Sequence, residues 1–167
     1  MSMPVSASHI GAASTSATFD MLTDPGYYEH LIALIPQSTM VSLDINRVAG
    51  TLTWTQRIVV PESVPAMAKR VIGPTMIVVE EHRWSAPAMD TVPTQADIQV
   101  RPQNLPAQMG GHMRITSPSS DGRCRVDIQA TVTVNVPLIG PHLETLIAQN
   151  YLSIVELRSQ AAFTWDN

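Results

Sequence analysis

The chain has 167 residues, the ordinary size of one domain, and can bury roughly 70% of its unfolded surface around one core. Its content of 44% apolar and 14% charged residues excludes an intrinsically disordered protein. Basic residues number 10 against 14 acidic ones, and Lys69 is the only lysine, so nucleic acid is not an expected partner. We therefore predict a single domain over residues 1–167.

The N-terminal part is predicted to hold one strand, two short helices and a hairpin. Residues 5–10 favour an edge strand, and residues 14–35 favour two helices interrupted at Asp24-Pro25-Gly26. Residues 40–46 alternate Val41, Leu43 and Ile45 with polar neighbours, and the turn at 48–50 joins them to residues 51–60. Leu52, Trp54 and Ile58 share one face of that second strand.

A short helix and a strand follow. In residues 61–73, Ser63 is the expected N-cap, Pro65 stands in the first turn, and Gly73-Pro74 ends the helix, which we place at the rim of the sheet. Residues 75–84 begin apolar on both faces, so alternation alone does not fix the strand's orientation. We predict that Met76, Val78 and Trp84 point inward, because the bulky indole most needs cover.

Three more strands are predicted, at residues 95–101, 108–116 and 125–136. The segment 117–122, SPSSDG, carries the turn residues of a hairpin between the last two, and Gly110 and Gly111 suit a bend or a bulge. The inward-facing residues are expected to be Ala96, Ile98, Val100, Met109, Met113, Ile115 and alternate residues from Val126 to Val136.

Residues 141–165 are predicted to form one long amphipathic helix of about 36 Å. Glu144, Gln149, Glu156 and Arg158 are expected to lie largely off its apolar stripe. The stripe consists of Leu143, Leu146, Ile147, Tyr151, Ile154, Leu157, Ala161 and Trp165.

This order of elements resembles the α+β helix-grip fold of the START-like and polyketide-cyclase-like superfamily, also called SRPBCC. The segments FDMLTDPGYYEH, IVVPESVPAMAKRVIGPTMIVVEEHRW and VTVNVPLIGPHLETLIAQN resemble the domain-of-unknown-function family 2505. The resemblance implies a curved antiparallel sheet of about seven strands around the terminal helix. It also implies a cavity between them that in relatives holds lipids, sterols or polyketides, but it carries over no catalytic residues.

A pocket between helix and sheet follows from this architecture, since a helix does not fill all of a strongly curved sheet. We expect its walls to combine aromatic residues with adaptable methionines. For each of these side chains the alternative is a close-packed dry core. The expected lining residues are Trp54, Met76, Trp84, Met109, Met113, Tyr151 and Ile154.

Gln56, Glu80 and His82 are the most interesting polar residues, because strand alternation turns them toward the same face as Trp54 and Trp84. A buried carboxylate beside an imidazole can act as general acid and base or hold one end of a ligand. The alternative is that the opposite strand face points inward, or that this end of the sheet is open to water.

Other chemistry finds little support. Glu80 and His82 lack a third metal ligand because the other histidines are scattered singly, so no metal or cofactor is expected. The single cysteine, Cys124, excludes an internal disulfide and fits a reducing compartment. Its neighbours Arg123 and Arg125 would lower a thiol pKa if they approached it, although a lone thiol is more often inert.

The first residues lack the basic and apolar regions of a secretory signal, and no window approaches 18 consecutive apolar residues. We therefore expect a cytoplasmic protein without membrane insertion. Our leading hypothesis is a non-catalytic module that binds a small hydrophobic ligand. Two others are a cyclase- or dehydratase-like enzyme using Glu80 and His82, and a protein-interaction module using Ile77 and Val79. The sequence determines neither the ligand nor the oligomeric state.

Overall fold

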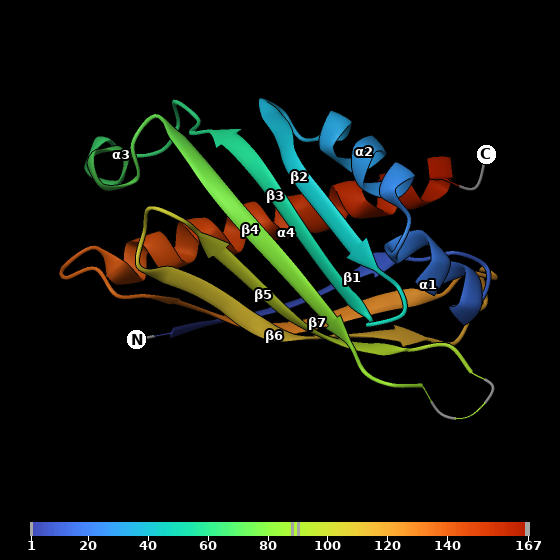
Figure 1. The fold of residues 1–167 in the computed structure, drawn as a ribbon. Helices are drawn as coiled ribbons and strands as arrows, with labels where there is room; N and C mark the ends of the chain where they lie inside the picture. The colour runs from blue at the N-terminus through green and yellow to red at the C-terminus, as the bar shows by residue number, and fades with distance from the viewer. Residues whose placement is uncertain (1, 88, 90, 166–167) are drawn as a thin grey trace.

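The computed structural model describes residues 2–87, 89 and 91–165. These residues form a curved seven-stranded sheet with the order β1-β7-β6-β5-β4-β3-β2, in which each neighbouring pair is antiparallel (Figure 1). The strands are β1 (Ser2–Ile10), β2 (Ser38–Asn46), β3 (Thr51–Val59), β4 (Thr75–Trp84), β5 (Gln95–Pro102), β6 (Ala107–Thr116) and β7 (Arg125–Val134). The helices are α1 (Thr15–Leu22), α2 (Pro25–Leu34), α3 (Ala66–Ile72) and α4 (Gly140–Trp165).

The sheet wraps around α4, which contacts β1 and β7 and, near its end, α2. The two ends of the molecule differ in what covers them (Figure 1). The α3 helix and the start of α4 lie at one end, whereas α1, α2 and the last turns of α4 lie at the other. In the described part of the chain, no helix combines the length and apolar character that crossing a membrane requires.

The two N-terminal helices form where the turn sequence indicated. The Ser14 side chain accepts a hydrogen bond from the Ala17 N–H and caps α1. The Asp24 side chain accepts from the Gly26 N–H and caps α2, with Pro25 in the first turn. The predicted break between the two helices is confirmed.

The capping prediction for α3 is wrong. Pro65, not Ser63, occupies the N-cap, and no side chain there makes a capping hydrogen bond. The predicted end of the helix is confirmed, because Gly73 adopts φ +87 and its N–H donates to the Lys69 carbonyl.

The orientation of β4 agrees with the prediction. Val78, Glu80, His82 and Trp84 are buried, and Met76 on the same face is half-buried. The opposite face carries Ile77 and Val79, both half-buried.

Alternation fails within β2, where Val41 is 50% exposed. The register with β3 shifts between Met40 and Ser42, so the pattern changes phase at a bulge. Met40, Leu43 and Ile45 consequently pack against the core.

The Gly110-Gly111 pair makes no bulge, since the β6–β7 register runs unbroken. A Cβ at Gly111 would lie 2.0 Å from the Gln129 carbonyl oxygen, whereas one at Gly110 would meet nothing within 4 Å. The two strands therefore approach each other closely at Gly111, which only glycine allows.

The terminal helix buries more than its apolar stripe. Leu143, Tyr151, Ile154 and Ala161 are buried as predicted. Glu144 and Arg158 are also buried, so their predicted placement off the stripe is wrong. Glu144 Oε1 accepts a hydrogen bond of 3.1 Å from the Val134 N–H. Because the sheet and α2 cover this helix from several sides, polar residues beside the stripe are enclosed as well.

Candidate functional site

A cavity of about 290 Å³ lies between the sheet and the first half of α4. Its walls come from β3, β4, β5 and β6, from the segment around α3, and from α4. The lining is mostly apolar, as in typical small-molecule sites. Its sheet and α3 side includes Ile58, Val64, Ile72, Met76, Val78 and Met109, and its helix side includes Leu146, Ile147, Tyr151 and Ile154.

The cavity has a buried end and an open end. Gln56 and Glu80 line it and are each only 3% exposed. Gln149, Asn150 and Ser153 line it from the exposed side of α4. Among the described residues that line the cavity, Glu80 alone carries a charge. A ligand that enters past α4 would therefore pass the polar side chains of Gln149, Asn150 and Ser153, then the apolar walls, and would meet Gln56 and Glu80 at the buried end.

Glu80 belongs to a buried polar cluster with Arg158 and His82. Arg158 Nη2 donates to Glu80 Oε1 at 2.8 Å and to Glu80 Oε2 at 2.9 Å. His82 Nε2 lies 2.6 Å from Glu80 Oε1 and donates to it, because the ionised carboxylate is only an acceptor. The cluster joins α4 to β4 in the interior of the protein.

The cluster keeps the Glu80–Arg158 pair charged. Burial raises the pKa of Glu80, but the Arg158 charge and the His82 hydrogen bond outweigh burial and hold that pKa at about 2. Burial lowers the pKa of Arg158, yet the Glu80 charge overcomes this and raises it above the ordinary value. Glu80 is therefore a carboxylate at neutral pH.

Aromatic rings enclose the cluster. The Arg158 guanidinium lies 5.9 Å from the centre of the Trp54 ring, and the Tyr27 hydroxyl donates to the Arg158 carbonyl at 3.3 Å. Burial raises the pKa of Tyr27 and of Tyr151, so both phenols stay neutral. Burial also lowers the pKa of nearby His9 to about 3, with the Arg158 charge as the next cause.

Five buried polar atoms around the cluster have no hydrogen-bond partner among the described protein atoms. They are His9 Nε2, Trp54 Nε1, Gln56 Oε1, His82 Nδ1 and Arg158 Nε. Of these five residues, only Gln56 lines the cavity. Its amide oxygen is thus an unsatisfied buried acceptor on a residue that lines the cavity.

The structure brings six of the ten residues predicted for the site to the cavity. These are Gln56, Met76, Glu80, Met109, Tyr151 and Ile154.

Trp54, His82, Trp84 and Met113 are buried but do not line the cavity. The Trp84 ring packs on Phe19 with centroids 5.2 Å apart, and the Trp54 ring packs on Tyr28 with centroids 5.3 Å apart. Aromatic residues of α1 and α2 therefore fill that half of the concave sheet.

Sequence reasoning missed Arg158 and the residues around α3. Arg158 stands four residues after Ile154 and three before Ala161, which is the spacing of the buried stripe. That spacing was the available signal, but the charge of the side chain argued against burial. Val64 and Ile72 carried no comparable signal, because a rim helix was not expected to close a cavity.

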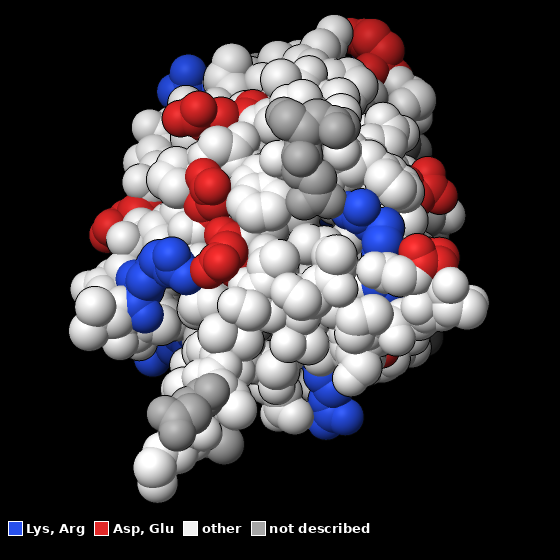
Figure 2. Space-filling model, turned by 90° about the vertical axis from the view of Figure 1, so that its right-hand side faces the viewer, with Lys and Arg blue, Asp and Glu red and all other residues white. Residues whose placement is uncertain are grey.

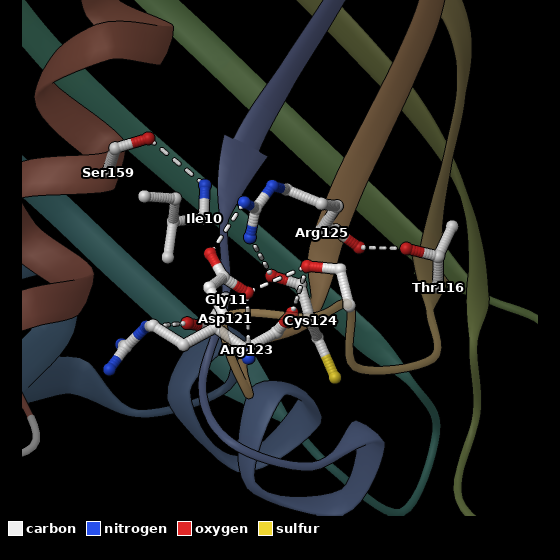
Figure 3. Close-up of polar contacts among 9 residues, drawn as sticks. Ile10, Gly11, Thr116, Asp121, Arg123, Cys124, Arg125 and Ser159 are labelled. Carbon is white, nitrogen blue, oxygen red and sulfur yellow. Dashed lines mark hydrogen bonds and ion pairs between the residues drawn. The ribbon is translucent and has the colours of Figure 1, made fainter.

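Cys124 is completely buried, and its flanking arginines serve other groups. Arg123 Nε donates to the Gly11 carbonyl at 2.9 Å, and Arg125 Nη2 pairs with Asp121 Oδ2 at 2.7 Å. The thiol and the two guanidinium groups point in different directions (Figure 3). This set of contacts ties the turn before β7 to the end of β1.

Other surfaces offer less. A larger hollow of about 770 Å³ lies between the start of α1 and residues 85–87 and 91–95, but none of the predicted site residues lines it. Basic and acidic side chains are scattered in small groups over the face in Figure 2. Within the ranges that the structure describes, no group of three or more His, Cys, Asp or Glu side chains is placed to hold a metal ion.

The family model described as "Protein of unknown function (DUF2505)" matches residues 6–165 of the chain. No curated protein sequence matches it. Solved structures with the same fold include a protein of Thermus thermophilus, with a TM-score of 0.63 and 14% identity over 99% of this chain and 100% of that one.

Two further solved structures are similar. The Zhui aromatase/cyclase of a Streptomyces species has a TM-score of 0.59 and 12% identity over 96% of this chain and 94% of that one. A START superfamily protein of Mycobacterium smegmatis has a TM-score of 0.57 and 13% identity over 97% and 98% of the two chains. These likenesses show the helix-grip fold that the sequence predicted.

Proposed function

The chain belongs to the DUF2505 family and has the helix-grip fold of the START-like superfamily, and from this premise we propose that it binds a small, mainly apolar molecule beneath α4. The observation that carries the proposal is the cavity of about 290 Å³, with apolar walls and a polar buried end. The fold is that of SRPBCC ligand-binding domains.

The cavity sets the size of the ligand. Its volume of about 290 Å³ lies at the lower limit of ordinary small-molecule pockets, which hold ~300–1,000 Å³. One water molecule occupies ~30 Å³ in the liquid, so the cavity has room for about ten non-hydrogen atoms. A compact molecule or a single short alkyl chain fits better than a whole phospholipid.

Binding without catalysis is favoured by the state of Glu80. A general acid or base works best with a pKa near the working pH, whereas Arg158 and His82 hold that of Glu80 at about 2. His82 does not line the cavity. One similar structure is named an aromatase/cyclase, and that activity belongs to that protein.

We also propose a cytoplasmic location, as the single cysteine favours, and a single-domain organisation.

Calorimetric titration with octanol tests the proposal, because this alcohol has a short apolar chain and about ten non-hydrogen atoms or fewer. The Ile154→Trp variant places an indole in the cavity, and Leu152→Trp makes the same change at a position on α4 that is 41% exposed. We expect the wild type and Leu152→Trp to bind octanol, and Ile154→Trp to bind at least about tenfold more weakly. The proposal is contradicted if the wild type and both variants bind octanol equally, or if the wild type does not bind it.

A further inference from the structure

We infer that the ligand of this cavity carries a neutral head group that donates a hydrogen bond, a hydroxyl above all, and that the cavity rejects carboxylates such as fatty acids. The inference rests on the proposed function and specifies its ligand. It comes from the polar atoms at the buried end of the cavity, where Gln56 and Glu80 lie.

The first observation is an acceptor without a partner. Gln56 lines the cavity, is 3% exposed, and its Oε1 atom makes no hydrogen bond with the described protein atoms. A buried acceptor that stays unsatisfied is costly. An O–H or N–H group on the ligand satisfies it, whereas a carboxylate or an ether oxygen has no proton to donate.

The second observation is the sign of the charge at the same end. Among the described residues, none that lines the cavity is Lys, Arg or His, and Glu80 is the single charged one. Arg158 is within reach of Glu80 but has already paired with both of its carboxylate oxygens. A ligand carboxylate would therefore be buried beside an anion without a cation of its own.

An ammonium head group is disfavoured for the complementary reason. Because Arg158 already balances the Glu80 charge, a buried ammonium would add an uncompensated cation. Because Arg158 and Glu80 already balance each other, a ligand ion of either sign would be buried without a counter-ion. Neutral head groups remain.

The third observation favours a hydroxyl among neutral groups. Tyr151 lines the cavity, and its side chain is buried, as those of Gln56 and Glu80 are. Burial keeps the phenol protonated, so it can donate as well as accept. A ligand hydroxyl can donate to Gln56 and accept from Tyr151, which an acceptor-only group cannot do.

The test compares four probes that each carry an unbranched eight-carbon chain: octanol, octyl methyl ether, octanoate and octylamine. Calorimetric titrations at pH 7 measure the dissociation constant of each. Octanol should bind about fivefold more tightly than the ether, because one hydrogen bond contributes ~1 kcal/mol to the binding free energy. It should bind at least about tenfold more tightly than octanoate and octylammonium, since a buried unpaired charge costs more than a lost hydrogen bond.

Gln56→Leu isolates the acceptor, and Gln99→Leu is its matched control. Gln56 lines the cavity, whereas Gln99 is an exposed residue of β5 that does not line it. The preference for octanol over the ether should disappear in Gln56→Leu and persist in Gln99→Leu. The comparison of the four probes in the unaltered protein stands even if Gln56→Leu does not fold.

The outcomes separate this inference from the proposed function. If octanoate or octylammonium binds as tightly as octanol, or if the ether does, the head-group inference is wrong while binding in the cavity stands. If none of the four probes binds, the proposed function fails and the inference fails with it.

Discussion

Arg158 Nη2 on α4 lies 2.8 Å from Glu80 Oε1 on β4, and both side chains are buried. This contact joins residues that are far apart in the chain and fixes the carboxylate at the buried end of the cavity. A buried pair is satisfied only while both partners are present, so this contact links the terminal helix to the sheet and balances the charge that a ligand meets.

Breaking the pair should strongly destabilise the fold. Arg158→Met leaves the Glu80 carboxylate buried and unpaired, and we expect a loss of about 3–5 kcal/mol in the free energy of unfolding, measured with urea. The double variant Glu80→Met, Arg158→Met removes both charges and should recover part of that loss.

Arg83→Met is the control for this experiment, because Arg83 lies on β4 with an exposed side chain. Its substitution should change the free energy of unfolding by less than about 0.5 kcal/mol. A loss below about 1 kcal/mol for Arg158→Met would show that the pair contributes little.

Acid should weaken the fold through His9. Its pKa is lowered to about 3, so the folded state keeps this imidazole neutral while the unfolded chain gains a proton below pH ~6.5. Since the unfolded state then binds more protons than the folded state, the free energy of unfolding decreases as the pH is lowered. Above pH ~6.5, His9 causes no loss in the free energy of unfolding, because it is neutral in both states. At pH 5 the proton that only the unfolded chain binds should lower the free energy of unfolding by roughly 2 kcal/mol.

Urea unfolding at several pH values between 7.5 and 5 measures this slope. His9→Gln should flatten it, whereas His112→Gln, at an exposed position on β6, should leave it unchanged. The same slope in His9→Gln as in the wild type would exclude His9 as the cause.

The close approach of β6 and β7 should make Gly111 intolerant of any side chain. A Cβ there would lie 2.0 Å from the Gln129 carbonyl oxygen and 2.5 Å from the Ala130 Cα, and backbone atoms yield little. We expect Gly111→Ala to lower the free energy of unfolding by about 2 kcal/mol or more. Gly110→Ala meets nothing within 4 Å and should be neutral or slightly stabilising. Similar effects of the two substitutions would argue against the close approach.

Most of the fold could be predicted because strand alternation and helix spacing depend on local sequence. The inward face of β4 was predicted from the need to cover Trp84, and Trp84 is 7% exposed. The bulge in β2 could not be predicted, because a register shift depends on how Met40 and Ser42 pair with β3.

The site was predicted less completely, for a physical reason. Alternation identifies which side chains point inward but not whether they meet a cavity or other side chains. Trp84 points inward, yet its ring packs on Phe19 of α1 instead of facing the cavity. Arg158 was missed because its charge alone favours exposure, and its burial depends on Glu80, 78 residues earlier.

Methyl NMR of the protein labelled at its methionines tests the central claim, ligand binding beneath α4, most directly. Met76 and Met109 line the cavity, Met113 is buried away from it, and Met67 is 62% exposed. On titration with octanol we expect saturable shifts of the Met76 and Met109 methyl signals, with nuclear Overhauser contacts to the octyl chain, and no change at Met113 or Met67. Changes confined to Met67, or none at saturating octanol, would contradict the account.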